Sequence, residues 1–230
     1  MNLVLSQKFK KEDKKKGQKK VREIMTSFGW WVLLVALGIA GTLCSGQESG
    51  PPLVPEDREA LRELQTVWGA ALDWVGEPSC FFPGVTCSAV NSSASVVVGL
   101  YARSASLCTG LPLALFSLKS LATLDLVHNW LQGSVPAEIS SLSRLAFLSL
   151  SHNQLSGPLP PLPPSLSMLD LSSNAFSALP SPLSLPSVFF LNLSSNAISA
   201  PLPLLLSSLP SLQYVFQKKI KSKASIHFLI

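Results

Sequence analysis

Leucines recur in the middle of the chain at fixed distances from an asparagine. The asparagines at positions 129, 153, 174 and 196 are separated by 24, 21 and 22 residues. With each asparagine as position n, apolar residues stand at n−8, n−5, n−3 and n+2, and usually at n−11. Internal periods of this length indicate stacked repeats, because one unit cannot bury its own apolar face. The pattern therefore predicts a solenoid with one short strand, at n−5 to n−3, in each repeat.

The same register assigns the inside and the outside of each unit. Leucines at the repeated offsets should point into one continuous core, and each Leu-x-Leu segment should join a shared parallel sheet. The asparagine side chains should bond backbone groups of their own turn and of the neighbouring repeat. Glycine at n+4 and proline at n+7 suit a return path of loops and 3-10 turns. This predicts a structural ladder of Asn129, Asn153, Asn174 and Asn196.

A fifth, degenerate unit lies 24 residues before Asn129, with Val97, Leu100 and Leu107 in register but Ala105 at the asparagine position. Residues 95–216 thus hold about five repeats. The pattern stops at Gln217, and we expect residues 217–230 to form a basic, disordered tail.

Between the buried leucines, each strand has side chains that should face outward on the concave side of the sheet. Exposed aromatic and Met side chains are favoured at interfaces, so we expect ligands to bind there. The candidate ligand-binding residues are Tyr101, Arg103, Thr123, Asp125, His128, Phe147, Ser149, His152, Met168, Asp170 and Phe190.

A helix and a cysteine pair precede the repeats. Apolar residues at 61, 64, 68 and 72 fall on one face of a predicted helix. This helix follows a proline-rich linker over 47–55. Cys80 and Cys87 lie close together, which in an exported chain indicates a disulfide. A metal site is the alternative for the pair, but no second Cys or His pair lies nearby. We place this amino-terminal cap at 56–94.

Residues 1–46 have the order of a secretory signal: lysines, then an apolar stretch from Phe28, then small residues ending at Gly46. The apolar stretch is short for a membrane-spanning helix. Cleavage would release the chain, whereas the long basic head before Met25 could keep the segment as an uncleaved anchor. Both readings place most of the chain outside the cell.

The cap and the repeats together resemble those of plant leucine-rich-repeat receptor-like proteins and receptor-like kinase ectodomains. In the cap, Asp57, Ala60, Leu61, Leu64, Trp74, Cys80, Gly84, Val85 and Cys87 match the family pattern, and Phe82 stands where a second Trp is usual. The Leu-x-x-Asn-x-Leu-x-Gly-x-x-Pro form is that of the plant-specific repeat. The resemblance implies a leucine-rich-repeat solenoid of the α/β type with a helical, disulfide-bonded cap. No kinase signature and no carboxy-terminal membrane span appear in the 230 residues.

The distribution of charge and the reactive side chains limit the classes of function that the chain can have. The net charge of +5 comes from lysines at the two ends, whereas residues 24–217 carry −5, so a nucleic-acid-binding domain is excluded. No catalytic constellation emerges, and we assign neither a catalytic residue, nor a cofactor, nor a metal site. His128 and His152 share one repeat position and should lie about 5 Å apart. A metal-binding or pH-sensing pair is the alternative to two ordinary surface residues.

We therefore expect a non-enzymatic ligand-recognition module of signalling or defence, with a protein or peptide ligand or a co-receptor as partner. It should be secreted to the apoplast or tethered at the cell surface, and it should contact a membrane only through an uncleaved amino-terminal anchor. Asn91 and Asn192 stand in glycosylation sequons. An inhibitor of secreted wall-degrading hydrolases is one alternative, and a truncated receptor fragment without function of its own is another.

Overall fold

The computed structural model describes residues 50–198 and 209–216. The expected signal or anchor at 1–46, the start of the linker and the basic tail at 217–230 lie outside the described residues. Within the described ranges, no helix combines the length and hydropathy that a membrane crossing requires.

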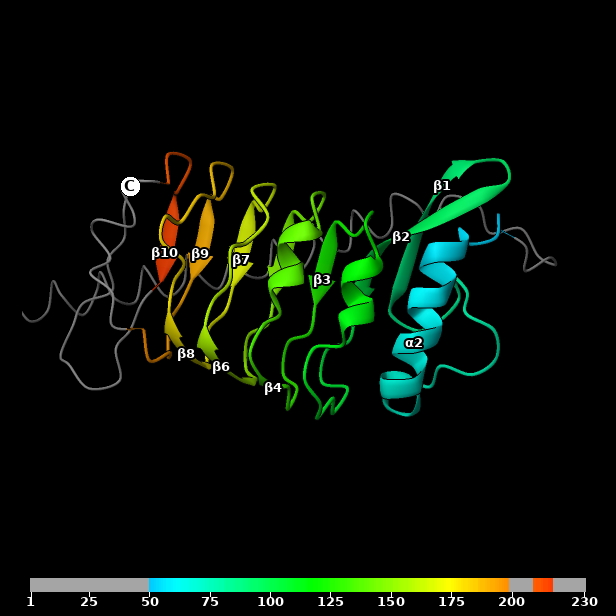
Figure 1. The fold of residues 1–230 in the computed structure, drawn as a ribbon, viewed down its shortest axis with the longest axis horizontal. Helices are drawn as coiled ribbons and strands as arrows, with labels where there is room; N and C mark the ends of the chain where they lie inside the picture. Colours follow the sequence, from blue (N-terminus) through cyan, green and yellow to red (C-terminus); the bar gives the residue numbers. More distant parts are fainter. Residues whose placement is uncertain (1–49, 199–208, 217–230) are drawn as a thin grey trace, which may run out of the picture. The chain divides into compact units, whose positions relative to one another are not determined.

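The helix of the cap is α2, Pro55–Leu72 (Figure 1). A proline at the first helical position suits a helix start, because its missing N–H would have no partner there. The helix ends at Asp73, which adopts a left-handed conformation with φ 54°. As the spacing predicts, Leu61, Leu64, Trp68 and Leu72 are buried.

The cap begins earlier than the predicted boundary at residue 56. Leu53, assigned to the linker, is buried and bridges to Ser95. The Val54 N–H donates to the Ser95 carbonyl oxygen over 2.9 Å. The last residues of the proline-rich segment are therefore part of the folded cap.

A hairpin joins the cap to the repeats, which the sequence did not predict. Strand β1, Val85–Asn91, pairs antiparallel with β2, Ala94–Tyr101. Cys87, in β1, forms the expected disulfide with Cys80. Phe82 stacks on Trp74 with ring centroids 5.0 Å apart, so an aromatic pair packs where the family pattern has two Trp. Gly84 has φ +79°, and a Cβ there would collide with the Tyr101 carbonyl.

The repeats build a seven-stranded sheet in the order β1-β2-β3-β5-β7-β9-β10 (Figure 1). From β2 onward the neighbours are parallel. Each repeat thus contributes one strand in register with the next, as the spacing predicts. The repeat strands are β3 Thr123–Asp125, β5 Phe147–Ser149, β7 Met168–Asp170, β9 Phe190–Asn192 and β10 Tyr214–Phe216.

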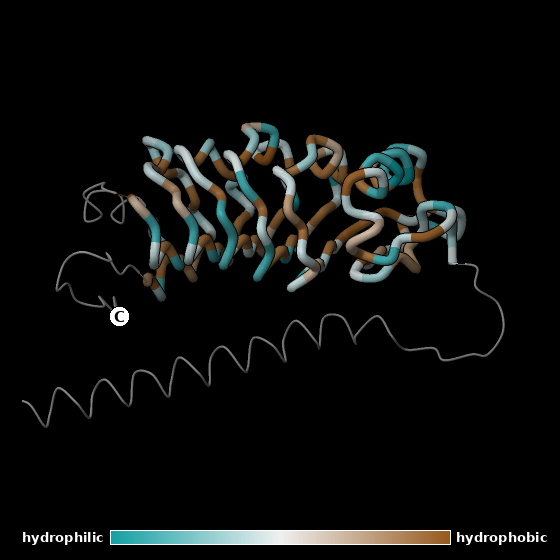
Figure 2. Tube along the Cα trace, turned by 90° about the horizontal axis from the view of Figure 1, so that it is seen from below, coloured by the Kyte–Doolittle hydropathy of each residue, from teal (hydrophilic) through white to brown (hydrophobic). Residues whose placement is uncertain are grey.

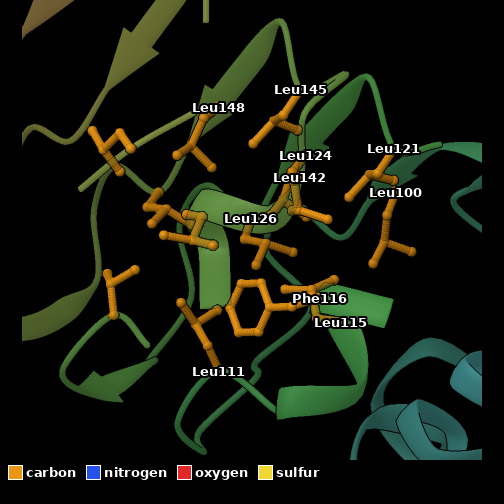
Figure 3. Packing of buried hydrophobic residues seen from close by; sticks show 14 of the residues in the cluster. Leu100, Leu111, Leu115, Phe116, Leu121, Leu124, Leu126, Leu142, Leu145 and Leu148 are labelled. Carbon is orange, nitrogen blue, oxygen red and sulfur yellow. The ribbon is translucent and has the colours of Figure 1, made fainter. Parts of the chain in front are cut away.

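Leucines from every repeat fill a single core under the sheet, and Figure 3 shows the part of it between Leu100 and Leu148. The predicted core residues from Val97 to Ile198 are buried in all repeats, with exposures of 0–3%. Phe116, from the return path, inserts its ring among them. Hydrophilic and hydrophobic segments alternate around each coil and recur in the next (Figure 2).

The opposite side of the repeats contains the expected 3-10 turns, η1 Leu113–Ser117 and η2 Ala137–Ser141. It also contains a second sheet of three short strands that the sequence did not predict: β4 Gln132–Gly133, β6 Gln154–Pro158 and β8 Ala175–Ala178. These strands follow the asparagine of their repeat, so the chain pairs with its neighbour on both sides of the core.

Replacing Asp57 with Asn is expected to change the pH dependence of stability. The buried Asp57 carboxylate accepts a 2.7 Å hydrogen bond from the Val97 N–H. Burial raises the pKa of this carboxyl above 3.8, with a smaller opposing effect of the Val97 bond. A carboxyl with a raised folded-state pKa stabilises the fold most below its unfolded pKa, and that contribution is lost as pH rises through the folded pKa. The wild type should therefore gain stability relative to Asp57→Asn as pH falls from about 7 towards about 4.

Thermal unfolding of both proteins across this pH range measures the effect. Glu63→Gln is the matched control, because Glu63 is an exposed acid of the same helix, whereas the charge of Glu56 itself helps to raise the pKa of Asp57. A difference in Tm between the wild type and Asp57→Asn that stays constant with pH would contradict the assignment.

Candidate ligand-binding site

The asparagine ladder holds the ends of the strands in place and so positions the exposed sheet face. The Asn153 Oδ1 accepts from the Leu131 N–H over 3.0 Å, and its Nδ2 donates to the Leu126 and Leu150 carbonyls at 2.9 and 3.0 Å. Equivalent bonds recur at Asn129, Asn174 and Asn196. The predicted ladder is confirmed, and each asparagine ties its own turn to the preceding repeat.

The first outward position of each strand forms an apolar column of Phe147, Met168, Phe190 and Tyr214. The strand register aligns these four residues on neighbouring strands. Adjacent parallel strands lie about 4.8 Å apart, so the side chains form a continuous stripe. Thr123 and Gly99 continue the register towards the cap. Phe147, Met168 and Tyr214 are half-buried, which leaves part of each side chain open to a ligand.

The second outward position forms a polar column of Asp125, Ser149, Asp170 and Asn192. Asp170 and Asn192 use their side-chain oxygens on the next turn of their own chain, where Ser172 and Ser194 donate through both N–H and hydroxyl. The side-chain oxygens of Asp170 and Asn192 are therefore already bonded within the protein, where they stabilise the turns at the ends of the strands.

Three candidate residues are not exposed as predicted. Asp125 is fully buried, because the Arg103 guanidinium covers it and donates from Nε over 2.6 Å. Ser149 is buried, and its hydroxyl lies 3.4 Å from that of Ser151. Phe190 is 5% exposed and packs on Phe216, with ring centroids 5.5 Å apart. For Asp125 and Phe190, a side chain from a neighbouring strand or turn covers the residue.

The remaining candidates lie where a ligand could reach them. Arg103 and the two histidines are exposed, and Tyr101, Thr123 and Asp170 are half-buried. Tyr101 and Arg103 are at the cap end of the sheet, whereas the apolar column spans the later repeats. The predicted binding residues therefore fall in separate parts of the face, with Tyr101 and Arg103 at the cap end and the apolar column in the later repeats.

Sequence reasoning missed Trp130, whose side chain is 61% exposed. It lines a shallow hollow of about 350 Å³ together with His128, His152, Gln154 and Ser173, over the ladder residues Asn129 and Asn153. The repeat alignment could have indicated it, because Trp130 follows the ladder asparagine where other repeats have Gln or Ala. A second hollow of about 600 Å³ lies beside the loops before β9 and β10, lined by residues that include Phe189 and Leu212.

The remaining reactive and modifiable groups are separate from the sheet face or already bonded. Cys108 is a free, exposed thiol. Asn91 is exposed at the tip of the β1–β2 hairpin, and Asn192 is half-buried in the polar column. Among the described residues, no three His, Cys, Asp or Glu side chains gather as a metal-binding group.

The family model described as Leucine Rich Repeat matches residues 120–142 and 144–166. No curated protein sequence matches the chain.

Solved structures from Arabidopsis thaliana have the same fold. The BIR2 ectodomain is 27% identical with a TM-score of 0.59, and the match covers 76% of this chain and 100% of that one. A chain of the BIR3–SERK2 complex is 28% identical with a TM-score of 0.57, covering 69% and 92%. The ectodomain of the receptor kinase HAESA, bound to an extended IDA peptide hormone, is 25% identical with a TM-score of 0.50, covering 69% of this chain and 32% of that one.

These similarities agree with four features of the chain: the repeat spacing, the asparagine ladder, the register of the sheet and the disulfide-bonded cap. The chain carries the leucine-rich repeats and the fold of plant leucine-rich-repeat receptor ectodomains.

Proposed function

We propose that the chain is an extracellular recognition module, without catalytic activity, that binds a protein or peptide ligand on the exposed face of its sheet. The observation that carries the proposal is the apolar column. Phe147, Met168 and Tyr214 remain partly exposed on parallel strands that the ladder holds rigid. Aromatic and Met side chains are favoured at interfaces, and aromatic rings on a fixed support lose little conformational entropy on binding.

The similar proteins support the same use of the fold. The HAESA ectodomain was solved with a peptide hormone, and BIR3 was solved in complex with SERK2. A peptide ligand or a second receptor ectodomain is thus the class of partner that we propose here, in signalling or defence.

The proposed location outside the cell rests on the disulfide, which forms and persists in oxidising compartments. The exposed sequon at Asn91 is open to a glycosyltransferase at its hairpin tip, and we propose that it is glycosylated. Asn192 is the second proposed acceptor, and a glycan there would cover part of the sheet face. The inhibitor alternative would favour a charged face, yet the Arg103 charge is paired with Asp125.

Replacing Met168 with Asp is expected to weaken ligand binding about tenfold or more, because a charge in a desolvated interface costs at least 1.4 kcal/mol. The chain, secreted from plant cells, would be screened against plant peptides and secreted receptor ectodomains. Each partner's affinity would then be measured by interferometry.

Glu138→Lys is the control, because Glu138 is exposed in the 3-10 turn η2 on the opposite side of the repeats. Partners that lose affinity with Glu138→Lys but not with Met168→Asp would place recognition elsewhere. A product that stays in the cytosol without a glycan would refute the extracellular part of the proposal.

A further inference from the structure

The side chains of His128 and His152, which the sequence predicts to lie one strand apart, stack directly on each other. The His128 and His152 ring centroids are 4.2 Å apart, and the ring planes are inclined by 20°. Both residues belong to one position of the repeat, directly before the ladder asparagine. We call this position, Ser104, His128, His152, Ser173 and Ser195, the histidine column.

The backbone fixes both histidines in the same way. Each has φ 56°, in the left-handed region. The His128 N–H donates to the Ser151 carbonyl over 3.0 Å, and the His152 N–H donates to the Ser172 carbonyl over 2.9 Å. Because the turn fixes both backbone positions, the two side chains are already neighbours, and only their rings must reorient to bind a third group.

The imidazole nitrogens are open to such a group. Both side chains are exposed, and within the described part of the chain neither imidazole makes a hydrogen bond or an ion pair. The hollow that they line also contains the neutral side chains of Trp130, Gln154 and Ser173. Two imidazoles held side by side, with their nitrogens free, are a donor set for a cation of borderline softness.

We propose that His128 and His152 form a two-ligand site for a divalent first-row transition metal ion, with Cu²⁺ bound more tightly than Zn²⁺. Imidazole suits both ions, and the order follows the general affinity series. Zn–N bonds are about 2.0–2.1 Å long, so the two coordinating nitrogens must approach to about 3.3 Å in a tetrahedral site. The stacked rings are inclined by only 20°, so both exposed rings must turn out of the stack before their in-plane nitrogen lone pairs converge on one ion. Water then completes the coordination. The site does not depend on the proposed ligand-binding function.

The array itself supplies the variants for a test. Serine occupies the histidine column at positions 104, 173 and 195 with φ values of 51–57°, so His128→Ser and His152→Ser place a residue that this turn already accommodates. Isothermal titration with Cu²⁺ and with Zn²⁺ should show one saturable site, on protein without a polyhistidine tag and with Cys108→Ser, which removes the free thiol, and His227→Ala. Either serine variant should lower the affinity at least about tenfold, since loss of even a second-shell partner costs that much.

A relocated pair distinguishes a metal site from a structural effect of losing a histidine. In His128→Ser/Ser173→His, the two imidazoles occupy the next step of the same column, where the Ser173 N–H donates to Ser194 as His152 does to Ser172. This variant should recover the affinity. Quenching of Trp130 fluorescence by Cu²⁺, absent in Trp130→Phe, should report occupancy of the hollow.

Mg²⁺ is the negative control, because it prefers oxygen ligands. Saturable binding that either serine variant weakens at least about tenfold and the relocated pair restores supports the proposal. Absence of saturable Cu²⁺ binding, an unchanged affinity in His128→Ser, or failure of the folded relocated variant to bind would overturn it.

Discussion

Replacing Phe176 with alanine is expected to destabilise the protein by about 3–5 kcal/mol, the usual cost of removing a buried phenylalanine. Phe176 is fully buried at the position two residues after the ladder asparagine. The equivalent positions hold Leu131, Leu155 and Ile198, which are also buried. A large ring fills this layer of the core, and alanine would leave a cavity between repeats that the strand pairing keeps from collapsing.

Phe176→Leu is the matched control, because it installs the residue that two other repeats use. It should cost less than about 1.5 kcal/mol, as expected for a hydrophobic substitution that nearly conserves volume. Denaturant unfolding followed by circular dichroism measures both variants. Equal losses for the alanine and leucine variants would mean that the ring shape, rather than the filled volume, stabilises this layer.

The core could be predicted from the sequence because its determinants lie within one repeat. Leu124 and Leu126 flank one outward residue in a strand, and a leucine at the same offsets follows in the next unit, so burial at one position implies burial at all. The same argument identified the ladder asparagines. It also placed the two histidines one strand apart, and their rings are 4.2 Å apart.

The outward face was harder to predict, because its burial is decided between repeats and by side-chain direction. Asp125 occupies a nominally exposed position but is covered by Arg103, 22 residues earlier. Phe190 is covered by Phe216 from the following strand. Neither contact can be derived from the pattern of a single unit. The exposed Trp130 and the three-stranded sheet lie after the asparagine, where the repeats vary most.

Replacing Asn153 with alanine is expected to cost about 2–3 kcal/mol, chiefly because the buried Leu131 N–H loses its acceptor. The carbonyls that Asn153 also bonds do not lose every partner. The Leu126 oxygen accepts from both Asn129 and Asn153, at 3.0 and 2.9 Å. One asparagine therefore still serves this carbonyl when the other is removed.

This sharing predicts a specific non-additivity. In Asn129→Ala/Asn153→Ala the Leu126 carbonyl loses both side-chain donors, so the double variant should lose about 1 kcal/mol more than the sum of the two single losses. Asn129 and Asn196 share no carbonyl, and their double variant should be additive within about 0.5 kcal/mol. Denaturant unfolding of the three single and two double variants against wild type gives both coupling energies. If the adjacent pair were as additive as the distant pair, each asparagine would stabilise only its own turn, and the ladder would not couple neighbouring repeats through their shared carbonyls.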